Sequence, residues 1–124
     1  MIRRQEEKRN WTDDQKYWQG LALFNSGHYF DAHEVLEDVW RASRGVEKKF
    51  LQGLIQVAVA LHHYSTGNVV GARSLLSRGR RNLEHYPEQY GGIELGGMLT
   101  AVRRWELALA EGGRLPAAPV IRRT

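Results

Sequence analysis

The fold is decided by a stretch that spans residues 24–41 and reads FNSGHYFDAHEVLEDVWR. Gly27 is a natural end for the helix that precedes it, because glycine readily adopts the left-handed backbone that closes a helix. After this glycine, apolar side chains recur at helical spacing from about Tyr29 to Ala42. The stretch therefore predicts two helices joined by a glycine turn.

Short breaks divide the rest of the chain into further helices. Residues 12–15 form a capping box with Thr12 as the predicted N-cap. Residues 47–66 are apolar almost all round, which is typical of a central, buried helix. Pro87 and the Gly91-Gly92 pair mark two later breaks. The predicted helices span about residues 12–26, 29–42, 47–66, 68–86 and 95–110.

An internal repeat indicates how these helices are arranged. A shift of 40 residues aligns Gly27 with Gly67, together with several apolar and small residues around them. The first copy resembles a tetratricopeptide unit, in which small residues let two helices approach closely. We therefore predict an all-α fold: a compact antiparallel bundle of about five helices that contains two tetratricopeptide-like hairpins. It would form a single helical domain over residues 1–124, with a flexible segment 1–10 and an extended surface tail 113–124.

Composition restricts the classes of function. The chain has 18 Lys plus Arg against 14 Asp plus Glu, but no aromatic residues interleave with the arginines as a base-stacking surface requires, so nucleic acid is an unlikely partner. The absence of cysteine excludes disulfides and thiolate metal sites. The longest apolar run is too short to span a bilayer, and the N-terminus lacks the apolar region of a signal peptide. We expect a soluble cytoplasmic protein without a membrane partner, and a homo-oligomer stays open.

The helix after Gly27 carries the most chemical information. At about 100° per residue, His33, Glu37 and Trp40 share one face, while Glu34 lies on the neighbouring, wetter face. If this helix and the next form an antiparallel hairpin at the turn near Gly45, both rise equally from that turn. His33 would then lie level with Gln56, and Glu37 level with Gln52.

The same estimate for the hairpin at Gly67 would place Arg78 level with Gln56, and Asn82 level with Gln52. We therefore expect a polar cluster, or a pocket, between the second, third and fourth helices.

Two chemical interpretations of this cluster stay open beside a purely structural hydrogen-bond network. His33 and Glu37 at positions i and i+4 could hold a divalent metal ion, with Glu34 as the base of a hydrolase, although no third protein ligand is evident. Alternatively His33 could act in acid–base catalysis with Glu37 or Glu34 and without a metal. No activated nucleophile and no phosphate-binding glycine loop accompany them.

Two blocks carry a family resemblance. Residues 24–40 and 51–62 resemble, in order and spacing, the uncharacterised helical family catalogued as domain of unknown function 309, over roughly residues 17–106. Members are sometimes labelled predicted metal-dependent hydrolases. The resemblance implies a small helical domain whose signature positions here are His33, Glu34, Glu37, Trp40, Gln52 and Gln56.

Two functions follow as hypotheses. The first is an enzyme or small-ligand site, hydrolytic and metal-dependent in its sharpest form, that uses His33, Glu34 and Glu37, with Arg78 and the glutamines shaping the site. The second is a tetratricopeptide-like interaction or structural module without catalysis. The sequence leaves the substrate, the partner and the cofactor open.

Overall fold

The computed structural model describes residues 11–124, and within them the chain forms five α-helices, a short 3-10 helix and a small β-hairpin. The all-α prediction is confirmed, because each of the two strands is only two residues long. In chain order the elements are η1 (Trp11–Asp13), α2 (Gln15–Asn25), α3 (Tyr29–Arg41), α4 (Gly45–Ser65), α5 (Val69–Leu83), β1 (Gln89–Tyr90), β2 (Ile93–Glu94) and α6 (Leu95–Glu111).

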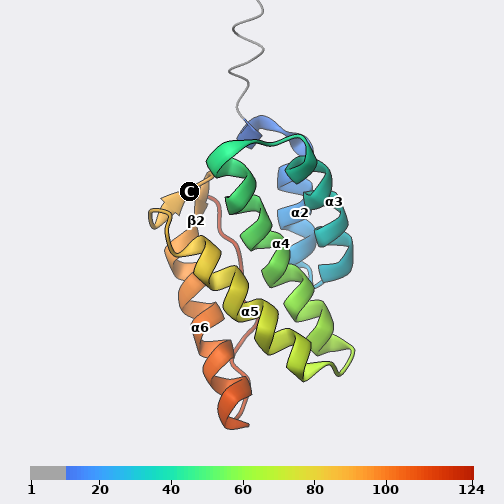
Figure 1. Cartoon of the computed structure of the whole chain (residues 1–124), viewed down its shortest axis with the longest axis vertical. Coiled ribbons are helices and arrows are strands. Elements are labelled where there is room, and N and C mark those ends of the chain that lie inside the picture. The colour runs from blue at the N-terminus through green and yellow to red at the C-terminus, as the bar shows by residue number, and fades with distance from the viewer. Residues whose placement is uncertain (1–10) are drawn as a thin grey trace, which may run out of the picture.

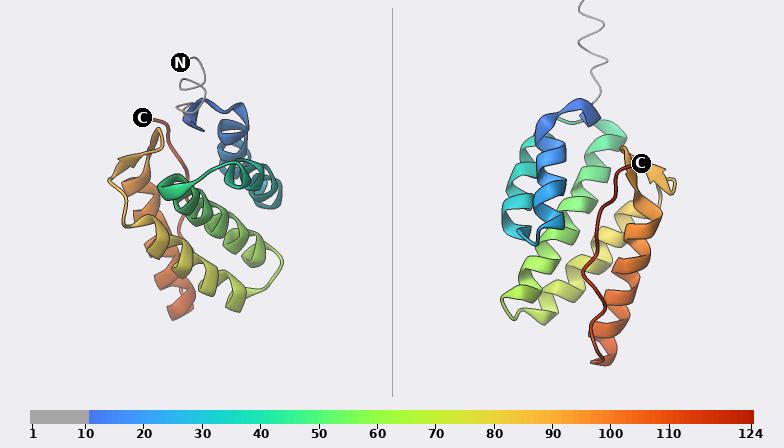
Figure 2. Two further views of the ribbon diagram at one scale, coloured as in Figure 1. Left: turned by 45° about the horizontal axis from the view of Figure 1, so that its top comes forward. Right: turned by 180° about the vertical axis from the view of Figure 1, so that it is seen from behind.

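The helices follow one another as packed neighbours. Helices α2, α3 and α4 lie side by side, α5 crosses α4, and α6 packs beside α5 (Figure 1). Seen from behind, the C-terminal tail passes along the side of α6 that faces α2 and α4 (Figure 2). Helix α4 therefore stands at the centre, with α3 on one side and α5 on the other.

The burial of α4 agrees with that central position. Eight of its residues are buried, more than in any other helix of residues 11–124. A helix that is apolar on most of its surface must be covered on most of its surface, because exposing apolar area to water is unfavourable. The predicted central role of residues 47–66 is thus confirmed.

The two glycine turns of the repeat have the same structure. Gly27 and Gly67 have φ angles of +83° and +89°. The N–H of Gly27 donates to the carbonyl of Phe24 at 3.0 Å, and the N–H of Gly67 donates to the carbonyl of Tyr64 at 3.0 Å. The correspondence at a distance of 40 residues, expected from the sequence, therefore holds at both turns.

Glycine also sets how closely α4 and α5 approach. A Cβ built at Gly79 would lie 3.0 Å from the carbonyl oxygen of Gly53 and 2.8 Å from Cγ2 of Val57. At the α2–α3 crossing, a Cβ at Gly20 would lie 2.7 Å from Cγ of Leu36. Small residues thus occupy the helix crossings, as the repeat predicted.

The tail is extended, but it is anchored more firmly than a surface tail. The side chain of Asn25 donates to the carbonyl of Ile121 and accepts from its N–H, both at 2.8 Å. The side chain of Ile121 is 5% exposed and belongs to the core. In addition, the indole of Trp105 donates to the carbonyl of Ala117 at 2.9 Å. The tail therefore completes the core between α2 and α6.

The predicted helix bounds agree with the observed ones to within three residues, but the first N-cap was wrong. Asp14 caps α2, and its carboxylate accepts from the N–H of Lys16 at 2.9 Å. Thr12 lies instead in the 3-10 helix, where its carbonyl accepts from the indole of Trp18 at 2.6 Å. The predicted flexible segment 1–10 lies outside the described residues.

None of the helices within residues 11–124 has both the length and the apolar character needed to cross a membrane.

Candidate functional site

The motif residues lie on the outer side of α3. This helix buries Ala32, Leu36 and Val39 against its neighbours, so the side chains between these positions face outward. His33 and Glu37 are partly exposed, at 19% and 38% of their side-chain areas, and His33 Nε2 lies 3.6 Å from Glu37 Oε2. The prediction that helical spacing brings these two side chains together is confirmed.

The His33 ring is also oriented from its other nitrogen. His33 Nδ1 lies 3.2 Å from the carbonyl oxygen of Phe30. Since a carbonyl oxygen only accepts, this contact requires the proton on Nδ1 and leaves the lone pair of a neutral ring on Nε2. The nitrogen that could bind a ligand or a proton is thus the one facing Glu37.

Glu37 belongs to a chain of surface ion pairs. Its Oε1 accepts from Arg41 Nη2 at 3.2 Å, and Arg41 Nη1 donates to Asp38 Oδ1 at 2.9 Å. Asp38 Oδ2 in turn accepts from Lys16 Nζ of α2 at 3.2 Å. The carboxylate of Glu37 is therefore shared between an imidazole and a guanidinium rather than aimed into a cavity.

An exposed aromatic ring stands at the N-terminal end of α3. The ring of Phe30 lies between the imidazoles of His33 and His62, with centroids 5.2 Å from each. Despite these contacts, Phe30 is 48% exposed. Because His62 belongs to α4, this cluster joins the outer sides of the two helices.

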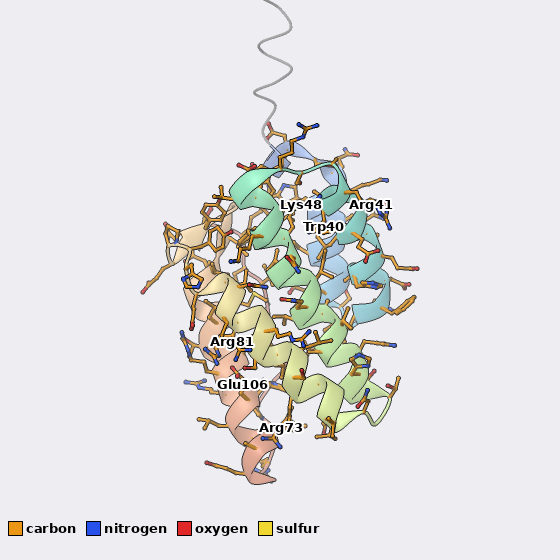
Figure 3. All side chains as sticks on the ribbon, in the orientation of Figure 1. Trp40, Arg41, Lys48, Arg73, Arg81 and Glu106 are labelled. Atoms are coloured by element: carbon orange, nitrogen blue, oxygen red, sulfur yellow. The ribbon has the colours of Figure 1, made fainter. Side chains whose placement is uncertain are left out.

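The C-terminal end of α3 meets α4 through a second aromatic contact. Lys48 Nζ lies 4.1 Å from the ring centroid of Trp40 (Figure 3). The indole N–H of Trp40 is buried and has no hydrogen-bond acceptor within the described part of the chain. We call this whole surface the α3–α4 seam, defined by Phe30, His33, Glu37, Trp40, Lys48 and His62.

The glutamines expected at the cluster are engaged elsewhere or exposed. Gln56 Oε1 accepts from Asn82 Nδ2 of α5 at 2.7 Å. The sequence placed Arg78 level with Gln56, and the contacts of Gly79 with Gly53 and Val57 agree with that register, but Arg78 is exposed and Asn82 supplies the partner of Gln56. Gln52 and Arg78 are exposed, and neither makes a hydrogen bond or ion pair among residues 11–124.

The structure therefore brings together only part of the predicted site. His33, Glu37 and Trp40 share the α3–α4 seam, while Glu34 is exposed beside it. The hydrogen-bonded pair Gln56 and Asn82 lies between α4 and α5 instead. Three described cavities, of about 380, 460 and 280 Å³, are lined by other residues. Among residues 11–124, no three His, Asp or Glu side chains are grouped so that they could hold a metal ion.

The sequence reasoning missed three seam residues, namely Phe30, Lys48 and His62. Phe30 precedes His33 by three positions, which places both on one side of a helix. That spacing was a usable signal for Phe30. His62 ends the second family block, but nothing in the sequence related it to Phe30, and no signal pointed to Lys48, because the contacts of both depend on how α4 packs against α3.

Comparison with known proteins supports the resemblance. Residues 17–75 match the sequence profile of a family described as a domain of unknown function, DUF309. This confirms the resemblance carried by the two sequence blocks, over a shorter range than the expected 17–106. The matched range contains the whole α3–α4 seam.

Two uncharacterized bacterial proteins are similar over 74 residues. One, from Aquifex aeolicus (strain VF5), is 35% identical, and the alignment covers 59% of this chain and 22% of that protein. The other, YpuF from Bacillus subtilis (strain 168), is 36% identical, with 57% of this chain and 42% of that protein covered. The aligned part thus spans less than half the length of either relative.

Proposed function

We propose that this chain, whose residues 17–75 match a family of unknown function, is a protein-interaction module. In this proposal two tetratricopeptide-like hairpins form one helical unit, and the α3–α4 seam is its docking surface. The observation that carries the proposal is the arrangement of the motif side chains. They lie in an open stripe along the outside of two helices, paired with one another.

The chemistry of the seam fits a protein partner. Protein interfaces are enriched in aromatic residues and arginine, surrounded by a polar rim. Phe30 is half exposed at one end and Trp40 lies under Lys48 at the other. An aromatic side chain can anchor a partner at a small loss of conformational entropy. Glu34, exposed beside the seam, would then act in partner selectivity rather than as a base.

The unsatisfied indole of Trp40 supports an interaction role over a purely structural one. Buried polar groups in a structural network are normally hydrogen-bonded, because an unsatisfied donor costs about 1–3 kcal/mol. The N–H of Trp40 has no such acceptor within residues 11–124. The seam therefore has an unsatisfied donor at its Trp40 end, as expected for a surface with another role.

A metal-dependent hydrolase is supported less well. A catalytic zinc site normally has three protein ligands and an open position. In residues 11–124, His33 and Glu37 form a pair without a third ligand at their level, so the donor set does not fit such a site. Stoichiometric zinc or manganese in untagged protein, lost in His33→Ala, would overturn this conclusion.

Site-specific photo-crosslinking tests the docking surface. A photoreactive phenylalanine analogue replaces Phe30, and in a matched protein it replaces Val120, an exposed apolar residue of the tail that is 42% accessible. Both proteins are irradiated in an extract of the source organism. The proposal predicts one discrete adduct from position 30 that position 120 does not give.

The partner in that adduct is then identified and purified, and its binding is measured. Glu34→Lys should weaken the complex without changing the helical content of the free chain, because the side chain of Glu34 is exposed. Identical adducts from both positions, or binding unaffected by Glu34→Lys, would contradict the docking role of the seam.

A further inference from the structure

A second surface, separate from the α3–α4 seam, runs along α5. Val70, Arg73, Ser77 and Arg81 recur at spacings of three and four residues, which places them in one stripe on the helix. Val70 is the most exposed of the large apolar side chains described, at 81%. An apolar residue so exposed, in line with two arginines, needs an explanation.

The charge of α5 is uniform and largely unneutralised. The helix contains four arginines and no acidic residue. Arg80 donates two hydrogen bonds to the carboxylate of Glu106, one of them from Nη2 to Oε2 at 3.3 Å. Its Nη1 also donates to Glu84 Oε2 at 3.0 Å. The nearest carboxylates are thus already paired.

The arginines of the stripe have no such partner. Arg73 makes no ion pair within residues 11–124, and Arg81 donates only to the hydroxyl of Ser77, at 2.7 Å. Arg81, Glu106 and Arg73 follow one another along the boundary of α5 with α6 (Figure 3). Two guanidinium groups therefore remain available to a ligand on this boundary.

A groove accompanies these charges. Its volume is about 460 Å³, and it lies between α5 and α6. Leu107, 61% exposed, stands on the α6 side opposite Val70. The lining residues are Val70, Arg73, Ser77, Glu106, Leu107 and Ala110.

We infer that this groove binds an acidic, amphipathic helical segment of another protein. An apolar side chain of that segment would pack between Val70 and Leu107. Arg73 and Arg81 are eight residues apart, or about 12 Å along the helix. Carboxylates two turns apart on the bound helix would therefore meet both guanidinium groups, each of which can bind a carboxylate in bidentate geometry.

Two other occupants fit the groove less well. A second copy could offer its acidic α3, where Asp31, Glu34 and Asp38 are exposed, but Asp38 is already paired with Lys16 and Arg41. A nucleic acid would use the arginines but would leave Val70 and Leu107 without an apolar partner. The apolar pair therefore favours a protein helix.

Fluorescence anisotropy with a defined probe tests the inference. The probe is a labelled synthetic helical peptide with a leucine stripe flanked by glutamates. Comparison ligands are a scrambled peptide of the same composition and a short DNA duplex. The protein variants are Arg73→Glu with Arg81→Glu, Val70→Ser with Leu107→Ser, and the control Arg104→Glu, which changes an exposed arginine on the tail side of α6.

Both double variants should bind the helical peptide at least about tenfold more weakly, because one removes the charge complementarity and the other the apolar anchors. Arg104→Glu, with a smaller change of charge but the same sign, should bind within about twofold of the unchanged protein. Circular dichroism should give the same helical content for all variants, since every substituted side chain is exposed.

Several outcomes would overturn the inference. Equal binding of the scrambled peptide, or no effect of the Val70 and Leu107 pair, would reduce the surface to nonspecific attraction between charges. If the DNA duplex bound more tightly than the helical peptide, and if Arg73→Glu with Arg81→Glu abolished that binding, the groove would be a nucleic-acid surface. Concentration-dependent self-association that the arginine variant abolishes would assign the groove to a second copy.

Discussion

Gly79→Ala tests the packing that places α5 across α4. The added Cβ would lie 3.0 Å from the carbonyl oxygen of Gly53, 3.2 Å from the N of Val57 and 2.8 Å from Cγ2 of Val57. Two of these three atoms belong to the backbone of α4, so they cannot move aside as a flexible side chain can. Overpacking typically costs about 1–3 kcal/mol, and the backbone contacts place the cost here at about 3 kcal/mol.

Alanine also favours a helix over glycine by up to about 1 kcal/mol. The free energy of unfolding of Gly79→Ala should therefore fall by about 2 kcal/mol. With a slope of about 1–3 kcal/mol per molar urea, the midpoint of urea unfolding should fall by about 1 M. The transition is measured by the circular dichroism signal of the helices, which is lost on unfolding.

Gly97→Ala is the matched control. Gly97 lies in α6 and is exposed, and a Cβ there would meet no atom within 4 Å. This variant should gain a few tenths of a kcal/mol, up to about 1, from helix propensity alone. If Gly79→Ala were as stable as Gly97→Ala, the close glycine contact between α4 and α5 would be refuted.

Three further predictions concern the tail, the core and the motif. Asn25→Ala should lower the free energy of unfolding by about 1–3 kcal/mol, because two hydrogen bonds to Ile121 are lost, and hydrogen exchange of the Ile121 amide should accelerate. Burial raises the pKa of Tyr17 above its ordinary value, so above about pH 10 the unfolded chain loses a proton that the folded chain keeps, and stability falls as the pH rises. Urea titrations at pH 8 and above 10 should show a shallower fall for Tyr17→Phe. His33→Ala should change the free energy of unfolding by less than about 1 kcal/mol, because its contact with Glu37 is partly exposed; a loss of about 3 kcal/mol in calorimetry would indicate a structural role instead.

The helices could be predicted because their ends are decided locally. Gly27 and Gly67 adopt positive φ angles that other residues rarely adopt. Those turns fix where α3 and α5 begin, whatever the rest of the chain does. The N-cap of α2 could not be predicted in this way, since Thr12 and Asp14 are both good caps. In the structure Asp14 caps α2, while the carbonyl of Thr12 accepts a hydrogen bond from the indole of Trp18.

The candidate site was predictable along one helix but not across helices. The spacing of His33 and Glu37 ensures that they meet on α3. The partner of Gln56 depends instead on which side of α5 faces α4. Close contact at Gly53 and Gly79 turns that side of α5 toward α4, so Asn82 reaches Gln56 and Arg78 is exposed.

The proposed docking role of the α3–α4 seam is tested most directly by one affinity. Isothermal titration calorimetry measures binding of the purified partner, identified by crosslinking from position 30, to Phe30→Ser and to Val120→Ser. These residues are similarly exposed, at 48% and 42%. If the seam is the docking surface, Phe30→Ser weakens binding at least about tenfold, as expected for an aromatic anchor, and Val120→Ser leaves it unchanged. Equal affinities of the two variants would contradict the account.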